Sequence, residues 1–250
     1  TSILKMMEKY EWRYHIKFHM LTLRMLGLWP RGEETYKPGL YMMHSATALT
    51  VFLLGHIFFQ VVNIYFIRTN LEAVTGTVYV LVIDMLVVFK VYCVITNMGM
   101  LKQLLRTLDT DMFQPKNTVQ MGAIEISTWF WKVIYKTLFS LCILPNMFWA
   151  IYPLLDTTST EQKRLPFLAW YPFDTTKSPM YELTYIYQIS SIVYITAIHI
   201  NIDALVAALN VFNGSQFDIL CDNLRNLHKL GENILKNFIG CVKHHKEILR

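Results

Sequence analysis

Residues 40–67 read LYMMHSATALTVFLLGHIFFQVVNIYFI, and this stretch decides the fold class. No Asp, Glu, Lys or Arg occurs between Lys37 and Arg68. A helix of about 20 apolar residues crosses the roughly 30 Å hydrocarbon core of a bilayer, so a charge-free run of this length predicts a transmembrane helix. The run is too long, and too far from the N-terminus, for the apolar core of a cleaved secretory signal.

Three further stretches have the same character and predict spans at 73–98, 134–155 and 181–205. Asp84 is the one acid near the middle of a predicted span, whereas Lys90 and Asp203 lie near the ends of theirs. The composition agrees, because 54% of the residues are hydrophobic and 16% are charged, against about 25% charged in a typical soluble domain. We therefore expect an all-α membrane protein with at least four spans.

The distribution of Lys and Arg predicts the orientation of these spans. Loops rich in basic residues stay in the cytoplasm, and the counts alternate as 7, 1, 4, 3 and 6 along the segments 1–39, 68–72, 99–133, 156–180 and 206–250. The two lowest counts fall in the second and fourth of these segments. We therefore expect a multi-pass protein of the plasma membrane, with both ends of this chain in the cytoplasm. A G-protein-coupled receptor has its N-terminus outside, and the count opposes that class.

The chain divides into three predicted parts: an amphipathic N-terminal segment (1–39), a four-helix transmembrane ligand-binding region (40–213) and a cytoplasmic amphipathic helix (214–250). Apolar and basic residues interleave over 10–29, which predicts a helix that either lies in the membrane interface or begins the bundle; Pro30 and Pro38 end it. An apolar stripe over 217–249 steps by three or four residues. We expect other helices, or a neighbouring subunit, to cover it.

The loop 156–180 is rich in both proline and aromatic residues. Proline prevents a long helix there. The aromatic residues indicate either a segment that folds back over the helices or a belt at the membrane surface.

The sequence contains no pattern typical of catalysis or metal binding. It lacks a Ser-His-Asp arrangement, a His-Glu-x-x-His motif and a glycine-rich phosphate loop, so we expect no enzyme activity, cofactor or metal site, and no nucleic-acid partner. The four cysteines lack disulfide spacing and predict free thiols. His56 and the other histidines of the spans read as hydrogen-bonded core residues. Asp84 is either the structural partner of a polar residue on a neighbouring helix or part of a polar path.

The outer halves of the spans carry large aromatic surfaces with few polar groups, as in pockets for small apolar molecules. Ordinary helix packing has the same composition, so both interpretations stay open. The candidate ligand-binding residues are Thr77, Tyr79, Val80 and Ile83 in the second span, Met147, Phe148, Trp149 and Tyr152 in the third, and Tyr185, Gln188 and Ser191 in the fourth.

Three motifs resemble one family. Residues 165–174 (LPFLAWYPFD), followed by 178–188 (SPMYELTYIYQ), resemble the second extracellular loop and fourth helix of insect odorant receptors. Residues 26–30 (LGLWP) resemble the N-terminal signature of that family, and residues 241–245 (CVKHH) resemble its cytoplasmic stretch before the fifth helix. The cytoplasmic N-terminus, which the basic count predicts independently, matches the inverted topology of the family.

The resemblance implies an inverted-topology seven-helix receptor-channel fold, of which four spans and a cytoplasmic helix are present. It implies a subunit of a hetero-tetrameric cation channel that assembles with an odorant co-receptor and opens when a volatile odorant binds in the outer half of the bundle. Helices five to seven of the family have no counterpart in these 250 residues, so no pore residue is assigned. A gustatory-type receptor channel, a non-channel membrane transporter and a structural membrane protein remain alternatives.

Overall fold

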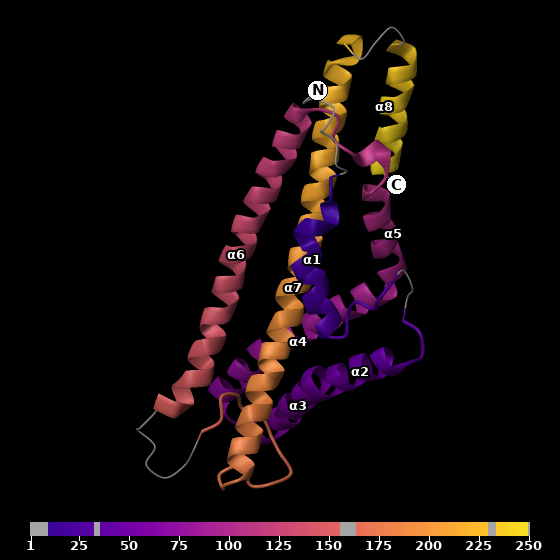
Figure 1. Ribbon diagram of the computed structural model, residues 1–250. Coiled ribbons are helices and arrows are strands. Elements are labelled where there is room, and N and C mark those ends of the chain that lie inside the picture. Colours follow the sequence, from indigo (N-terminus) through magenta and orange to yellow (C-terminus); the bar gives the residue numbers. More distant parts are fainter. Residues whose placement is uncertain (1–9, 33–35, 156–163, 230–233, 250) are drawn as a thin grey trace. The chain divides into compact units, whose positions relative to one another are not determined.

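The computed structural model describes residues 10–32, 36–155, 164–229 and 234–249. Every regular element in these ranges is helical (Figure 1). The α-helices are α1 (Trp12–Met25), α2 (Leu40–Ala48), α3 (Gly55–Ile67), α4 (Leu71–Thr96), α5 (Met98–Leu108), α6 (Thr118–Leu155), α7 (Met180–Arg225) and α8 (Ile234–Ile248). A π-helical segment, Leu49–Leu54, joins α2 to α3, and short 3-10 turns occupy Asp111–Phe113 and Leu227–Lys229.

The all-helical prediction and the four predicted spans are confirmed. The helices long and apolar enough to cross a membrane are Leu40–Ile67, Leu71–Thr96, Thr118–Leu155 and Met180–Arg225. The last two extend well beyond the apolar stretches that predicted them. The 46 residues of α7 measure about 69 Å at 1.5 Å per residue, more than twice the thickness of the hydrocarbon core.

The first span contains a local irregularity. The helix is continuous from Leu40 to Ile67, but Leu49–Leu54 adopts π-helical geometry. Such a turn frees backbone carbonyls from the usual hydrogen bond to residue i+4. The hydroxyl of Tyr187 on α7 donates to the carbonyl of Val51 at 2.9 Å, so a side chain from another helix satisfies one backbone oxygen in this segment.

Residues cluster into two compact units. Unit 2 comprises 21–98 and 137–202, which include α2, α3, α4 and the apolar parts of α6 and α7. Its buried face on α4 carries Thr77, Asp84, Val87, Val91 and Val94, spaced by three, four or seven residues as one face of a helix requires.

Unit 1 comprises 1–20, 99–136 and 203–250. Here α1 is packed into the unit, because Trp12 and Ile16 are fully buried and His19 nearly so. The Trp12 ring meets Phe212 of α7 at 5.2 Å, and the His19 ring meets Tyr135 of α6 at 4.4 Å. Of the two interpretations of segment 10–29, these contacts favour the start of a helix bundle over a helix that only lies in the interface.

The prediction of one continuous helix over 214–250 is wrong, whereas the cytoplasmic location of this segment stays a prediction. Gln216 Oε1 lies 3.2 Å from His244 Nε2, whereas 28 residues of one straight helix would separate them by about 42 Å. The chain therefore reverses direction between α7 and α8. At the end of α7, the Asn226 amide donates to both the carbonyl and the carboxylate of Asp222, which caps the helix terminus.

The expected apolar stripe over 217–249 is mostly uncovered in this chain. On α8 the buried positions are Cys241 and His244, while Phe238, Ile239 and Val242 are about half exposed. The face of α8 that meets α7 is thus the less apolar one. The expectation that another subunit or another part of the receptor covers the stripe remains a prediction.

Candidate ligand-binding site

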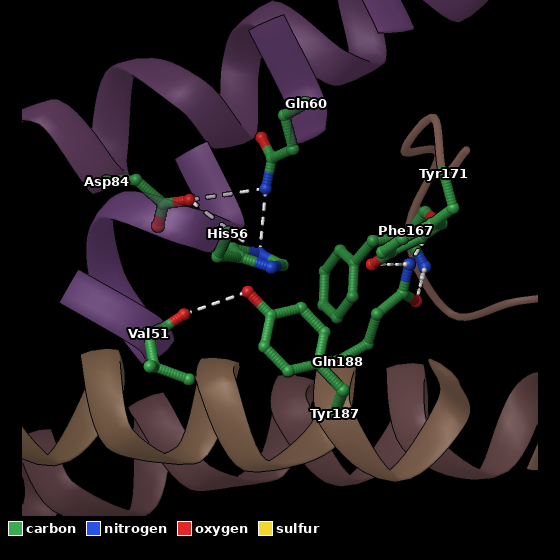
Figure 2. A network of polar contacts seen from close by, with 8 residues as sticks. All are labelled: Val51, His56, Gln60, Asp84, Phe167, Tyr171, Tyr187 and Gln188. Carbon is green, nitrogen blue, oxygen red and sulfur yellow. Dashed lines mark hydrogen bonds and ion pairs between the residues drawn. The ribbon is translucent and has the colours of Figure 1, made fainter. Parts of the chain in front are cut away.

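A buried polar network joins the first two spans (Figure 2). The Gln60 amide nitrogen lies 2.7 Å from His56 Nε2, one turn away on α3, and donates to Asp84 of α4 at 3.3 Å. The Asp84 carboxylate is also 3.8 Å from His56 Nε2. All three side chains are almost completely buried. Asp84 therefore has the structural partners on an adjacent helix that one of its two interpretations required.

The aromatic loop, defined as residues 164–179, is hydrogen-bonded to one amide side chain of α7. Gln188 Oε1 accepts from the Phe167 backbone N–H at 3.0 Å, and Gln188 Nε2 donates to the Phe167 carbonyl at 3.0 Å. The same nitrogen donates to the Tyr171 hydroxyl at 3.2 Å. Gln188 is fully buried, so its amide replaces water as the hydrogen-bonding partner of the loop backbone.

The aromatic loop also packs on α3. Its Trp170 N–H donates to the Phe59 carbonyl at 3.1 Å, and the Trp170 ring stacks on Phe66 at 5.5 Å. Tyr171 lies 4.6 Å from the Phe59 ring. Burial raises the pKa of Tyr171 to about 12, so its hydroxyl remains protonated at neutral pH. The described part of the loop folds back over the helices, as one interpretation expected; residues 156–163 lie outside the described residues.

Phe167 connects the loop to the polar network. Its ring packs edge-on against His56 at 5.6 Å and against Trp149 of α6 at 4.8 Å, and Figure 2 shows it between His56 and Gln188. Tyr185 of α7 donates to the carbonyl of Ala150, the residue that follows Trp149. The C-terminal end of α6 and the N-terminal end of α7 therefore meet beside the aromatic loop.

A glycine permits the close approach of α7 to the first span. A Cβ at Gly55 would lie 2.8 Å from the Tyr187 hydroxyl, which is shorter than van der Waals contact. This hydroxyl donates to Val51 in the π-helical segment. Glycine at 55 thus keeps Tyr187 in reach of the backbone of the first span.

The structure brings together only part of the predicted site. Trp149, Tyr185 and Gln188 belong to the cluster around Phe167. Ser191 is fully buried one turn further along α7. On α6, Met147, Phe148 and Tyr152 point out of the described chain, with 52%, 69% and 63% of their surface exposed.

The predicted residues of α4 are less closely connected to this cluster. Thr77 is buried and donates to the carbonyl of Ala73 in its own helix, Val80 is half-buried, and Tyr79 and Ile83 are exposed. Asp84, which was not among the candidates, is the α4 residue that reaches the network.

Sequence reasoning missed the first span and the loop as parts of the site. His56 and Gln60 are four residues apart on one helix face, and a polar pair at this spacing inside an apolar span was an available signal. Nothing local indicated that Phe167, in the loop, would meet His56. His56 Nδ1 and Gln60 Oε1 have no partner among the described residues, so the network retains hydrogen-bonding capacity for one further polar group.

The described residues hold no group of three or more His, Cys, Asp or Glu side chains placed to bind a metal ion. All four cysteines are free thiols, as the sequence predicted. The candidate site combines aromatic rings with polar side chains, a composition found in pockets for small molecules.

Known sequences match most of this chain. A sequence model of the family described as 7tm Odorant receptor matches residues 70–250. The odorant receptor Or1 of Anopheles gambiae is 23% identical over 206 residues, which are 81% of this chain and 48% of that protein. Odorant receptor 83a of Drosophila melanogaster is 28% identical over 96 residues, which are 38% of this chain and 20% of that protein. The chain thus spans about half of Or1 and a fifth of receptor 83a.

Solved structures agree in fold. The insect olfactory receptor OR5 from Machilis hrabei, in complex with eugenol, superposes with a TM-score of 0.77 at 21% identity over 94% of this chain and 62% of that one. The structure of the same receptor described without eugenol gives the same values. The family match covers more than half of the chain and agrees with the fold, so this chain belongs to the insect odorant receptor family.

Proposed function

We propose that this chain is the ligand-binding part of an odorant receptor subunit that holds a small volatile organic molecule beneath the aromatic loop. The observation that best supports this proposal is the set of contacts around Phe167, where the aromatic loop, α3, α6 and α7 meet. Beside these contacts, α6 presents Phe148, Trp149 and Tyr152 as exposed aromatic surface. A volatile molecule offers mainly apolar surface, and aromatic side chains provide large contact areas for it.

For Gln188 we propose a role other than the ligand contact that the sequence predicted. Its amide already bonds to the backbone of Phe167 and to Tyr171, so we assign it to fixing the loop. We assign direct contact with the odorant to Trp149 and Tyr152, together with Met147 and Phe148 on the same helix. The α4 candidates Thr77, Tyr79, Val80 and Ile83, and Tyr185 and Ser191 of α7, form the remainder of the proposed site.

Ligand binding beside Phe167 is well placed to influence the conformation of the bundle. A ligand shifts a conformational equilibrium only by the difference between its affinities for the two states. Phe167 contacts residues of the first, third and fourth spans. A molecule that moves the Phe167 ring or packs against it therefore changes contacts of three helices. We infer that this shift opens a cation channel formed with a co-receptor subunit in the plasma membrane, with the N-terminus in the cytoplasm.

Tyr152→Ala in the full-length receptor tests the proposal. Loss of one aromatic side chain from the site is expected to weaken binding by about 1–3 kcal/mol, which is roughly 5- to 150-fold in the odorant concentration for half-maximal current. The measurement is a concentration–response curve in cells that also express the co-receptor, with surface expression quantified in parallel.

Tyr92→Ala is the matched control, because Tyr92 is 64% exposed and Tyr152 is 63% exposed, while Tyr92 lies on α4 away from the loop. Its concentration–response curve should match that of the unmodified receptor. Equal sensitivity of the Tyr152 variant and the unmodified receptor, at equal surface expression, would remove Tyr152 from the ligand site.

A further inference from the structure

The LGLWP motif, residues 26–30, forms a rigid turn between α1 and the first span. Gly27 has φ +86°, and a Cβ there would lie 2.8 Å from the Cα of Ser45 on α2. The Leu28 N–H donates to the carbonyl of Leu23 at 2.7 Å. A left-handed glycine followed by such a bond is typical of the end of a helix, and only glycine fits here because the backbone of α2 is so close.

Tyrosine hydroxyls hold the backbone of this turn from several directions. Tyr41 accepts from the Trp29 N–H at 3.0 Å and donates to the carbonyl of Arg24 at 3.1 Å. Tyr36 donates to the carbonyl of Gly27, and Tyr194 of α7 donates to the carbonyl of Leu26, each at 2.9 Å. The turn is therefore fixed in place before any ligand arrives, which lowers the entropy lost on binding.

A cavity of about 790 Å³ adjoins this turn. Among the described residues, nine line it; Arg24, Arg31, Lys37 and His44 of these are basic and none is acidic. The Nε atom of Arg24 is buried and has no hydrogen-bond partner among the described residues. The segment 24–44 keeps a net positive charge even when Glu33 and Glu34 of the sequence are counted. These features favour an anion.

The position of the cavity and its apolar lining indicate which class of anion it binds. The first span begins at Leu40, so the cavity lies where that helix leaves the bilayer. Leu21, Met25 and Leu40 also line it, and 52%, 71% and 86% of their respective surfaces are exposed. The lining thus combines guanidinium groups, which bind phosphate oxygens in pairs, with open apolar surface for hydrocarbon.

We propose that this cavity binds an anionic phospholipid, with its phosphate between Arg24 and Arg31 and its acyl chains along Leu21, Met25 and Leu40. The excess of basic residues around the N-terminal segment assigns the cavity to the cytoplasmic leaflet, where anionic lipids are concentrated. The bound lipid fixes the α1–α2 turn, and hence the N-terminal end of the first span, to the membrane surface.

The test measures lipid binding by the purified full chain. Native mass spectrometry is used to titrate phosphatidylserine and phosphatidylcholine against the unmodified protein and the double variant Arg24→Gln/Arg31→Gln. Each basic residue near a charged membrane contributes about 1 kcal/mol, or roughly five-fold in affinity. The double variant should therefore bind phosphatidylserine at least ten-fold more weakly, while phosphatidylcholine binding stays unchanged.

Lys17→Gln is the matched control, because Lys17 is an exposed basic residue of the same helix that does not line the cavity. It should change phosphatidylserine affinity by less than two-fold. An equal loss of phosphatidylserine affinity in the Lys17 variant would show that the lipid is held by non-specific electrostatic attraction, and would overturn the proposal. Competition by inorganic phosphate at lipid-like affinity would overturn the lipid assignment in favour of a free phosphate compound.

Cross-linking the unmodified protein keeps the proposal testable if the double variant fails to fold. A photoactivatable phosphatidylserine in phosphatidylcholine nanodiscs should label peptides within residues 21–44 more than any other segment. Labelling concentrated elsewhere would overturn the proposal. Neither measurement involves odorants or currents, so the outcome is independent of the function proposed above.

Discussion

Two of the polar networks that join helices in the described residues differ in their access to water. In unit 2, His56, Gln60, Asp84 and Gln188 are each at most 1% exposed. In unit 1, the Gln120 amide of α6 donates to Asp222 at 2.7 Å and to Asn223 at 3.0 Å on α7. Gln120 and Asn223 are buried, but Asp222 is half-buried and another of its partners, Asn117, is exposed.

Similar amide side chains therefore contribute differently to stability in the two networks. In unit 1, water reaches Asp222 and Asn117 and competes for their hydrogen bonds, so these bonds set the register of two helices at modest net energy. In unit 2, no solvent reaches the network, and each bond satisfies a polar group that would otherwise be buried alone. A broken bond should therefore have a larger effect in unit 2.

The largest expected effect comes from Gln188→Leu. The change removes three hydrogen bonds and leaves the Phe167 backbone N–H and carbonyl without their partner. At about 0.5–1.5 kcal/mol per bond, the free energy of unfolding should fall by roughly 2–4 kcal/mol. Thermal unfolding of the purified protein measures it, and backbone hydrogen exchange at Phe167 should accelerate.

Asn213→Ala is the control for this change, because Asn213 is an exposed amide on the same helix. It should leave thermal unfolding and the exchange at Phe167 unchanged. Normal protection of Phe167 in the Gln188 variant would mean that ring packing alone holds the aromatic loop.

A smaller effect is expected from Gln120→Leu. The change removes three hydrogen bonds, to the Lys116 N–H, Asp222 and Asn223. Water can replace the lost partner at the exposed Lys116 and at the half-buried Asp222, so the free energy of unfolding should fall by about 1–2 kcal/mol, less than for Gln188→Leu under the same conditions. The two variants make the same chemical change in the two networks. A loss for Gln120 equal to that for Gln188 would contradict the proposed difference in solvent access.

The smallest expected effect is a pH dependence of stability that arises from His244. Burial, assisted by the nearby charge of Lys116, lowers the pKa of His244 to about 4, whereas an exposed histidine titrates near 6.5. Below pH 6.5 the unfolded chain therefore binds a proton that the folded chain does not. Stability is complete above that value and falls as the pH drops towards 4.

Between pH 7 and 5.5 the loss from His244 should be about 1 kcal/mol. Thermal unfolding at the two pH values measures it, and His244→Gln should reduce the difference, because glutamine does not titrate. His245→Gln is the matched control, since His245 is exposed on the same helix. An unchanged pH difference in the His244 variant would assign the effect to other groups.

Sequence patterns predicted the helices of unit 2 better than those of unit 1. The span boundaries followed from charge-free runs, because a charge inside hydrocarbon is costly wherever it occurs in the fold. The reversal between α7 and α8 was missed, since the apolar period continues through the turn and hides the break. Asn226, which caps α7 through its bonds to Asp222, was the local signal.

For the candidate site, the sequence alone determined which kinds of residue each helix carries. Hydropathy and helical period are local properties, so they placed Trp149 on the predicted third span and Tyr185 and Gln188 on the predicted fourth, while the position of these residues in the outer half of the bundle stays a prediction. Only the tertiary structure decided that Gln188 binds the loop backbone, that Asp84 pairs with Gln60 and His56, and that Tyr152 faces outward. These outcomes depend on how helices distant in sequence rotate and pack against one another, which no local pattern specifies.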